Sequence, residues 1–194
     1  MVDHSPTGQE AQWCSVGVDD VLGGELAATH LIERGHDLLA YAGAARGIRQ
    51  SLDRLAGVRR ASEEAGRADG VTVLGTDGLS VAAGRQAGAR LLGLPRRRRP
   101  TAVVCGNDLI ALGLLQQMTR HGVRVPGEVA LVGYDDIDFA AAAAVPLTSV
   151  MQPRALLGRT AAELLIEEAG ANGAHEHRHV RYAPELVVRE SSGG

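Results

Sequence analysis

The sequence has few of the features that mark several classes of protein. Only 2 of its 194 residues are cysteines, too few for a disulfide framework, so both are expected as reduced thiols. No apolar run approaches the ~18 residues of a membrane-spanning helix. Residues 1–12 are polar and lack the apolar centre of a secretory signal. We therefore expect a cytoplasmic protein that does not contact a membrane.

A strong charge of one sign is also absent. The formal net charge is −3, so the chain as a whole shows no basic character of the kind that binds nucleic acid. Lysine is missing altogether, and the arginine run at 96–99 is better explained as a solvated loop than as a phosphate site. The sequence has no G-x-G-x-x-G, Walker A or G-x-S-x-G motif. No spacing brings Ser, His and Asp together as a triad, so we expect no enzyme.

The chain does contain a regular alternation of strand and helix patterns. Short apolar runs predict strands at 16–18, 38–42, 71–74, 101–105 and 129–132, with further extended pieces at 148–152 and 183–190. Helical spacing predicts helices at 21–34, 50–65, 80–92, 108–121 and 154–169. This alternation predicts an α/β fold with a doubly wound parallel sheet. Ligands of such sheets bind at the edge where the strands have their carboxyl ends.

Polar residues follow two of the predicted strands. Asn107 and Asp108 come after 101–105, and Asp135 and Asp136 come after 129–132. We expect these side chains to meet in one crevice, and we expect Asp108 also to cap the helix that follows it. A metal site in the run 135–138 is disfavoured because the spacing is not that of a calcium loop. The alternating histidines 175, 177 and 179 are a second metal alternative, for which a variable polar loop is the preferred interpretation.

A series of short motifs in a fixed order resembles the lactose-repressor/galactose-repressor family of bacterial transcriptional regulators. The resemblance runs from about Val16 to Ser192. The motifs are Val16-Gly-Val-Asp-Asp20, His30-Leu-Ile-Glu-Arg-Gly-His36, Arg54-Leu-Ala-Gly57, Pro100-Thr-Ala-Val-Val104, Asn107-Asp108 with Ala111-Leu-Gly113, Gly122-Val-Arg-Val-Pro126, Val132-Gly-Tyr-Asp-Asp136, Pro146-Leu-Thr148, Gln152 and Glu185-Leu-Val-Val-Arg-Glu-Ser191.

The resemblance implies a periplasmic-binding-protein-like fold of two α/β lobes joined by three crossovers, with a small effector between them. It divides the chain into 1–36, a remnant of the N-terminal lobe; 37–147, a complete C-terminal lobe; 148–177, a crossover and returning helix; and 178–194, a last crossover and tail. Crossovers are expected at 35–37, at 148–152 and near Tyr182. The sequence begins beyond the family's helix-turn-helix headpiece, and truncation is the preferred explanation over a naturally minimal effector domain. We expect the region to aggregate or self-associate through unpaired strand edges and exposed apolar surface.

The resemblance also assigns effector-contacting residues. Arg54 matches the family's effector-binding arginine, and its guanidinium suits adjacent sugar hydroxyls or a carboxylate. The alternative is a surface arginine paired with Asp53 or Glu63. Asn107 matches a residue at the mouth of the cleft, and Asp135 matches the ligand carboxylate, which accepts hydrogen bonds from two vicinal hydroxyls.

Three further positions complete the expected site. Gln152 lies at a crossover, where the alternative is a solvent-facing hinge residue. Gln50 is at a position that varies with the effector. Leu79 stands where sugar-binding members often carry a stacking aromatic residue, which disfavours a hexose and leaves room for a smaller ligand.

The expected function is effector binding and dimerisation in a cytoplasmic transcriptional repressor, without a cofactor or metal. The partners implied are a sugar-like small molecule, a second copy in the intact protein, and operator DNA bound only through a headpiece absent from this chain. One alternative is the sugar-binding protein of a transport system, which would need an export signal. A sugar-processing enzyme is the other, and it would need a positioned nucleophile or base.

Overall fold

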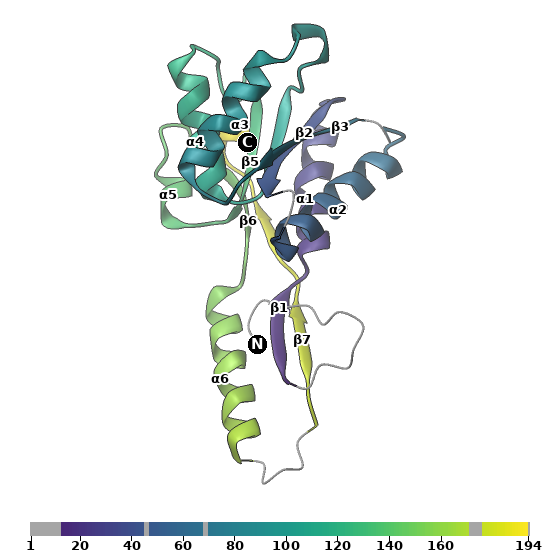
Figure 1. Ribbon diagram of the computed structural model, residues 1–194, viewed down its shortest axis with the longest axis vertical. Coiled ribbons are helices and arrows are strands. Elements are labelled where there is room, and N and C mark those ends of the chain that lie inside the picture. The colour runs from purple at the N-terminus through teal and green to yellow at the C-terminus, as the bar shows by residue number, and fades with distance from the viewer. Residues whose placement is uncertain (1–12, 45–46, 68–69, 171–175, 194) are drawn as a thin grey trace. The chain divides into compact units, whose positions relative to one another are not determined.

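The computed structural model describes residues 13–44, 47–67, 70–170 and 176–193 (Figure 1). The strands are β1 (Ser15–Val18), β2 (Leu39–Ala44), β3 (Val71–Thr76), β4 (Ala102–Cys105), β5 (Ala130–Asp135), β6 (Thr148–Met151), β7 (His179–Tyr182) and β8 (Glu185–Val187). The helices are α1 (Asp20–Glu33), α2 (Arg49–Glu64), α3 (Val81–Gly93), α4 (Asp108–Arg120), α5 (Asp138–Ala141) and α6 (Arg154–Gly170), with 3₁₀ turns η1 (Arg96–Arg98) and η2 (Glu190–Ser192). None of the helices in this described part of the chain has the length and hydropathy that spanning a bilayer requires.

The chain forms two compact units. The larger comprises residues 20–151 and 185–194, and the smaller comprises residues up to 19 and 152–184. The larger unit is built on a six-stranded sheet in the order β3-β2-β4-β5-β6-β8, in which all neighbours pair in parallel except the antiparallel β8. The predicted α/β fold with a mainly parallel sheet is therefore confirmed.

Alternating side chains of the central strands fill two separate cores, one on each face of this sheet. On β2, Leu39 and Tyr41 join the core formed with α1 and α2, whereas Ala40 and Ala42 join the core formed with α3 and α4. Figure 1 shows these two helix pairs on opposite faces of the sheet. Successive strand residues point to opposite faces, so a strand covered on both sides must be apolar at every position. This explains the unbroken apolar runs in the sequence.

Glycines let the first helix pair approach closely. A Cβ on Gly24 of α1 would lie 2.0 Å from the backbone oxygen of Arg54 on α2, and a Cβ on Gly57 of α2 would lie 1.9 Å from the backbone oxygen of Val21 on α1. No Cβ atom fits at such distances, so the close packing of α1 against α2 requires glycine at both positions.

The second helix pair repeats this arrangement on the other face. A Cβ on Gly84 of α3 would lie 2.3 Å from the backbone oxygen of Ile110, and a Cβ on Gly113 of α4 would lie 2.2 Å from that of Val81. In both pairs each glycine faces a carbonyl of the residue three positions before the partner glycine. The two faces of the sheet are therefore covered by helix pairs with the same reciprocal glycine contact.

The smaller unit has one helix and one pair of strands. β1 and β7 pair in parallel, with Val16 opposite Val180 and Val18 opposite Tyr182. The helix α6 packs on β1, and its Leu157 and Leu164 join the core of this unit. Thr160 Oγ1 and Tyr182 Oη form a hydrogen bond of 2.8 Å, which ties the helix to β7.

The structure groups some residues differently from the expected division at residue 36. The helix α1 packs against α2 and belongs to the larger unit, so the chain passes between units at Asp19 and not at residues 35–37. The other two passages, after Met151 and after Pro184, lie close to the expected crossovers at 148–152 and near Tyr182. The division at residue 36 was wrong for α1 because its unit depends on which helix buries its apolar face. The local sequence of α1 does not show that this helix is α2.

Candidate functional site

Arg54 lies at the centre of the carboxyl edge of the large sheet. Its Nε donates to Asp20 at 2.7 Å, one terminal nitrogen donates to the backbone oxygen of Gly106 at 2.6 Å, and its guanidinium stacks 3.5 Å from the ring centre of Tyr134. Only 4% of the residue is exposed. The alternative of a surface arginine paired with Asp53 is wrong, because the side chain is buried and Asp53 pairs with Arg49.

The charge of Arg54 is maintained despite its burial. Burial by itself would lower the pKa of the guanidinium, but the carboxylate of Asp20, together with Tyr134 and Asp135, raises it above its usual value. A charged guanidinium therefore lies at the ends of β4 and β5. It has five N–H donors, of which the two hydrogen bonds described above use two. Such a group can donate to the oxygens of a polar ligand.

The chain turns sharply where β5 ends. Asp135 has φ 103° and Asp136 has φ 49°, values that L-residues with a Cβ rarely adopt. Each such residue costs roughly 1–3 kcal/mol, and conformations of this kind persist where surrounding contacts enforce them. The side chain of Asp135 is partly exposed, and its charge acts on both Arg54 and Asp108.

Several polar contacts hold this strained turn. The carboxylate of Asp108 accepts from the backbone nitrogen of Ile137 at 2.9 Å and from the hydroxyl of Ser149 at 2.6 Å. Ser149 Oγ in turn accepts from the backbone nitrogen of Asp136 at 3.1 Å, and Arg189 pairs with the Asp136 side chain at 2.6 Å. These contacts come from three parts of the sheet edge, namely α4, β6 and the segment after β8, and together they hold the turn in place.

Asp108 has a different role from the expected one. It is fully buried and does not cap α4; the cap is Asn107, whose Oδ1 accepts from the backbone nitrogen of Ile110 at 3.0 Å. Burial raises the pKa of Asp108 to about 6, although the hydrogen bonds from Ser149 and Ile137 favour its ionised form. The cap prediction was wrong because both residues are good caps and the backbone geometry selects the earlier one.

Asn107 and Leu79 lie side by side at this edge. Asn107 Nδ2 donates to the backbone oxygen of Leu79 at 3.3 Å, and Leu79 packs against the core formed with α3 and α4. Arg54 reaches the same place, because its Gly106 acceptor directly precedes Asn107. The structure therefore gathers Arg54, Asn107, Asp135 and Leu79 along the carboxyl ends of β3, β4 and β5.

The remaining two expected residues lie elsewhere. Gln50 is the second residue of α2 and is partly exposed. Gln152 follows β6 and belongs to the smaller unit, so its participation in the site stays a prediction.

Sequence reasoning missed the residues that support Arg54 and the strained turn. These are Asp20, Tyr134, Ser149 and Arg189, together with the true role of Asp108. One signal was present: Ser149 is a hydroxyl within the otherwise largely apolar run 145–151, and a buried polar group of this kind needs a partner.

The chain is similar to a known domain family and to characterised transcriptional repressors. Residues 28–192 match the family model described as periplasmic binding protein-like domain. The chain is 33% identical over 169 residues to the HTH-type transcriptional repressor PurR of Aliivibrio fischeri strain MJ11, covering 87% of this chain and 50% of that protein. It is 35% identical over 183 residues to the arabinose metabolism transcriptional repressor of Geobacillus stearothermophilus, covering 91% and 49%. The chain thus spans about half the length of these curated relatives.

Solved structures show the same similarity. A LacI family transcriptional regulator from Enterococcus faecium with bound ribose superimposes with a TM-score of 0.86 at 29% identity, covering 95% of this chain and 67% of that one. The complex of the transcriptional regulator CelR with cellobiose superimposes with a TM-score of 0.87 at 33% identity, covering 98% and 57%.

Proposed function

Because the chain belongs to the family of periplasmic-binding-protein-like domains, we propose that it is the effector-binding portion of a bacterial transcriptional repressor. In the intact protein it works as a homodimer in the cytoplasm. A helix-turn-helix segment outside the matched region binds operator DNA, and the effector changes its affinity by favouring one conformation. The similarity to two repressors supports this function.

The observation that carries the proposal is the strained turn that presents Asp135 beside the charged Arg54. A carboxylate accepts hydrogen bonds from neighbouring hydroxyls, while a guanidinium donates to hydroxyl or ring oxygens. A small molecule rich in hydroxyls satisfies both groups. The ribose and cellobiose bound by similar regulators support a sugar-like effector.

Leu79 narrows the size of the proposed ligand. An aliphatic side chain provides no flat face for stacking on a sugar ring, so it favours a compact ligand such as a pentose. Asn107, Gln50 and Gln152 complete the proposed contacts as amides, each able to donate and to accept. The site binds its ligand without transforming it, since binding alone is sufficient to shift a conformational equilibrium.

Thermal unfolding with a panel of ribose, arabinose, cellobiose and adenosine tests this function. We expect a pentose to raise the unfolding temperature, by an amount corresponding to about 2.7 kcal/mol at 100 times its Kd. Asp135→Asn, which keeps the shape and tolerates a positive φ, should abolish the shift. Asp138→Asn is the matched control, because Asp138 is exposed in the first turn of α5 and should leave the shift unchanged.

Two outcomes would contradict the proposal. In the first, no compound of the panel stabilises the wild-type chain. In the second, a sugar stabilises Asp135→Asn as much as wild type. Mass spectrometry of the bound sugar after prolonged incubation checks the absence of turnover, and a chemically altered sugar would indicate an enzyme.

A further inference from the structure

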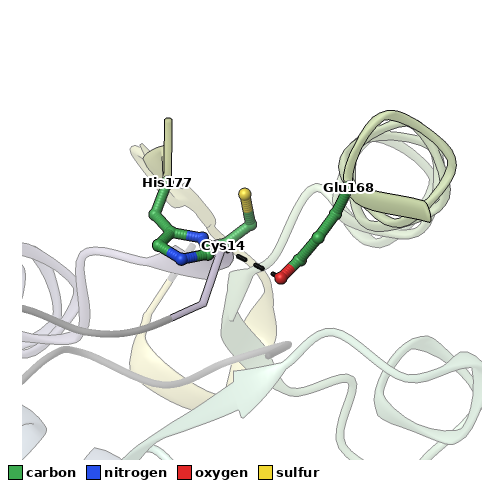
Figure 2. Close-up of side chains that lie close together, drawn as sticks. All are labelled: Cys14, Glu168 and His177. Carbon is green, nitrogen blue, oxygen red and sulfur yellow. Dashed lines mark ion pairs between the residues drawn. The ribbon is translucent and has the colours of Figure 1, made fainter. Parts of the chain in front are cut away.

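Three side chains of different chemistry gather in the smaller unit, outside the site described above. They are Cys14, just before β1; Glu168, near the end of α6; and His177, shortly before β7. One donor atom from each lies within 4.8 Å of the other two. Figure 2 shows Glu168 extending from its helix toward His177 and Cys14, with the contact between His177 and Glu168 marked.

The surroundings of this cluster are suited to a bound cation. His177 Nδ1 lies 3.9 Å from Glu168 Oε1, and Cys14 Sγ accepts a hydrogen bond from the backbone nitrogen of Arg178 at 3.4 Å. Cys14 is buried, whereas Glu168 and His177 are partly exposed.

A cavity gives access to the cluster. Cys14 and Glu168 line a cavity of about 320 Å³, whose other walls are mainly apolar side chains of α6 together with Val16. An ion in this cavity can reach both residues, and the space leaves room for a water molecule.

We propose that Cys14, Glu168 and His177 form a zinc-binding site. Sulfur, imidazole nitrogen and carboxylate oxygen are the three donor types that Zn²⁺ takes in proteins. A thiolate and a carboxylate balance the two positive charges of the ion, and the neutral imidazole adds a third ligand. Binding releases the thiol proton of Cys14 to solvent.

The geometry requires only a small contraction. Zinc bonds of ~2.3 Å to sulfur and ~2.1 Å to nitrogen or oxygen place tetrahedral ligands roughly 3.5 Å apart. The three donor atoms lie within 4.8 Å of one another, so each pair must close by at most roughly 1.3 Å. Water from the cavity supplies the fourth ligand. The ion links the last turns of α6 to the segments that enter β1 and β7.

The proposed zinc site differs from the metal site of histidines 175, 177 and 179 that the sequence suggested, because it uses only His177 of the three. His179 Nδ1 forms a hydrogen bond with Ser15 Oγ at 2.8 Å and is not part of the three-residue cluster, and residue 175 lies outside the described residues. The zinc site therefore requires His177 but not His179.

A zinc titration of the metal-free chain, in competition with a chromophoric chelator, tests the proposal. We expect one equivalent to bind, and Cys14→Ser, Glu168→Gln and His177→Gln each to weaken the affinity at least ~10-fold. Matched controls are Cys105→Ala, Glu167→Gln and His179→Gln, which replace the same residue types outside the site and should leave the affinity unchanged. Circular dichroism establishes that each variant is folded.

Cobalt provides a second readout that depends on the sulfur ligand. Co²⁺ added to wild type should produce the near-ultraviolet thiolate-to-cobalt charge-transfer band, and so should Cys105→Ala; Cys14→Ser should not. If Cys14→Ser does not fold, the comparison of Glu168→Gln with Glu167→Gln decides, because Glu168 is only partly buried and Glu167 is exposed, so neither change removes a core side chain. The proposal is overturned if no zinc binds, if the target and control variants bind alike, or if His179→Gln removes binding.

Discussion

The hydroxyl of Ser149 on β6 donates to the carboxylate of Asp108 on α4 at 2.6 Å, and this contact supports the strained turn at Asp135. The same carboxylate holds the backbone nitrogen of Ile137. Because burial raises the pKa of Asp108 to about 6, the group that positions the proposed ligand carboxylate is itself sensitive to mildly acidic pH.

Asp108→Asn should loosen the turn. Ser149 and Ile137 donate to different oxygens of the carboxylate, and asparagine has an NH2 group in place of one of these oxygens, so one of the two hydrogen bonds is lost. We expect a loss of about 1–3 kcal/mol in the free energy of unfolding at pH 7, and a weaker thermal shift with any sugar that stabilises wild type. Urea unfolding measures the first effect, with Asp138→Asn as the control. An unchanged midpoint would show that the carboxylate does not hold the turn.

The pH dependence of the Asp108 contribution has a definite sign. Its pKa is raised from 3.8 to about 6 on folding, so between these values the folded state binds more protons than the unfolded state. The stability contribution of this group is greatest below pH 4 and falls as the pH rises to 6. In wild type, the ionisation of Asp108 should lower the free energy of unfolding by up to about 3 kcal/mol between pH 4 and pH 6, and Asp108→Asn should lack this pH dependence. Urea unfolding of variant and wild type at each pH measures the difference.

The titration of His30 changes stability in the opposite direction, over a pH range that overlaps with that of Asp108. Its Nε2 bonds Ser192 Oγ at 2.7 Å, and its Nδ1 lies 3.1 Å from Arg34, which can only donate. The neutral ring therefore carries its proton on Nε2. Burial, then the charges of Arg34 and His36, lower the pKa of His30 from 6.5 to about 4.

Folding is therefore favoured by the neutral form of His30. Below pH 6.5 the unfolded state takes up a proton that the folded state resists, so stability falls as the pH drops toward 4. His30→Gln should remove roughly 1–3 kcal/mol of this pH dependence, whereas the exposed His121→Gln should not. A pH profile of His30→Gln parallel to that of wild type would contradict this assignment.

The pair Asp20–Arg54 should be costly to break on one side. Asp20→Ala leaves a buried guanidinium without this partner, so we expect a loss of about 3–5 kcal/mol. Asp53→Ala removes the partner of the exposed Arg49 at nearly the same distance and should cost less than about 1 kcal/mol. Chemical denaturation measures both. Similar costs for the two variants would indicate that burial does not determine the strength of the pair.

The reciprocal glycine contacts predict which glycines tolerate a methyl group. Gly57→Ala and Gly84→Ala would place a Cβ 1.9 and 2.3 Å from a carbonyl oxygen of the facing helix, and should each cost about 2–3 kcal/mol or more. Gly158→Ala on α6 meets nothing within 4 Å and should stabilise by roughly 0.5–1 kcal/mol through helix propensity. Thermal unfolding compares the three. A stabilised Gly57→Ala would contradict the close approach.

Much of the fold could be predicted from local patterns. The helix with the Ser80 cap was expected and is present, with Ala83 N donating to Ser80 Oγ at 3.2 Å. The order of short motifs also identified the family resemblance, which the matches to repressors and regulators confirm. The partners of Arg54 could not be predicted, because Asp20 and Tyr134 are brought to it by packing between elements distant in the chain.

The sequence by itself determined the alternation of strands and helices and their mainly parallel arrangement, and it predicted the carboxyl edge of the sheet as the place of the proposed site. These follow from side-chain periodicity and from the rules of chain connection, which act over short stretches. The tertiary structure alone decided that Arg54 is buried and charged, that Asn107 rather than Asp108 caps α4, and that Cys14, Glu168 and His177 meet. Those results depend on contacts between residues far apart in the chain, and a local sequence pattern does not show which distant residues come into contact.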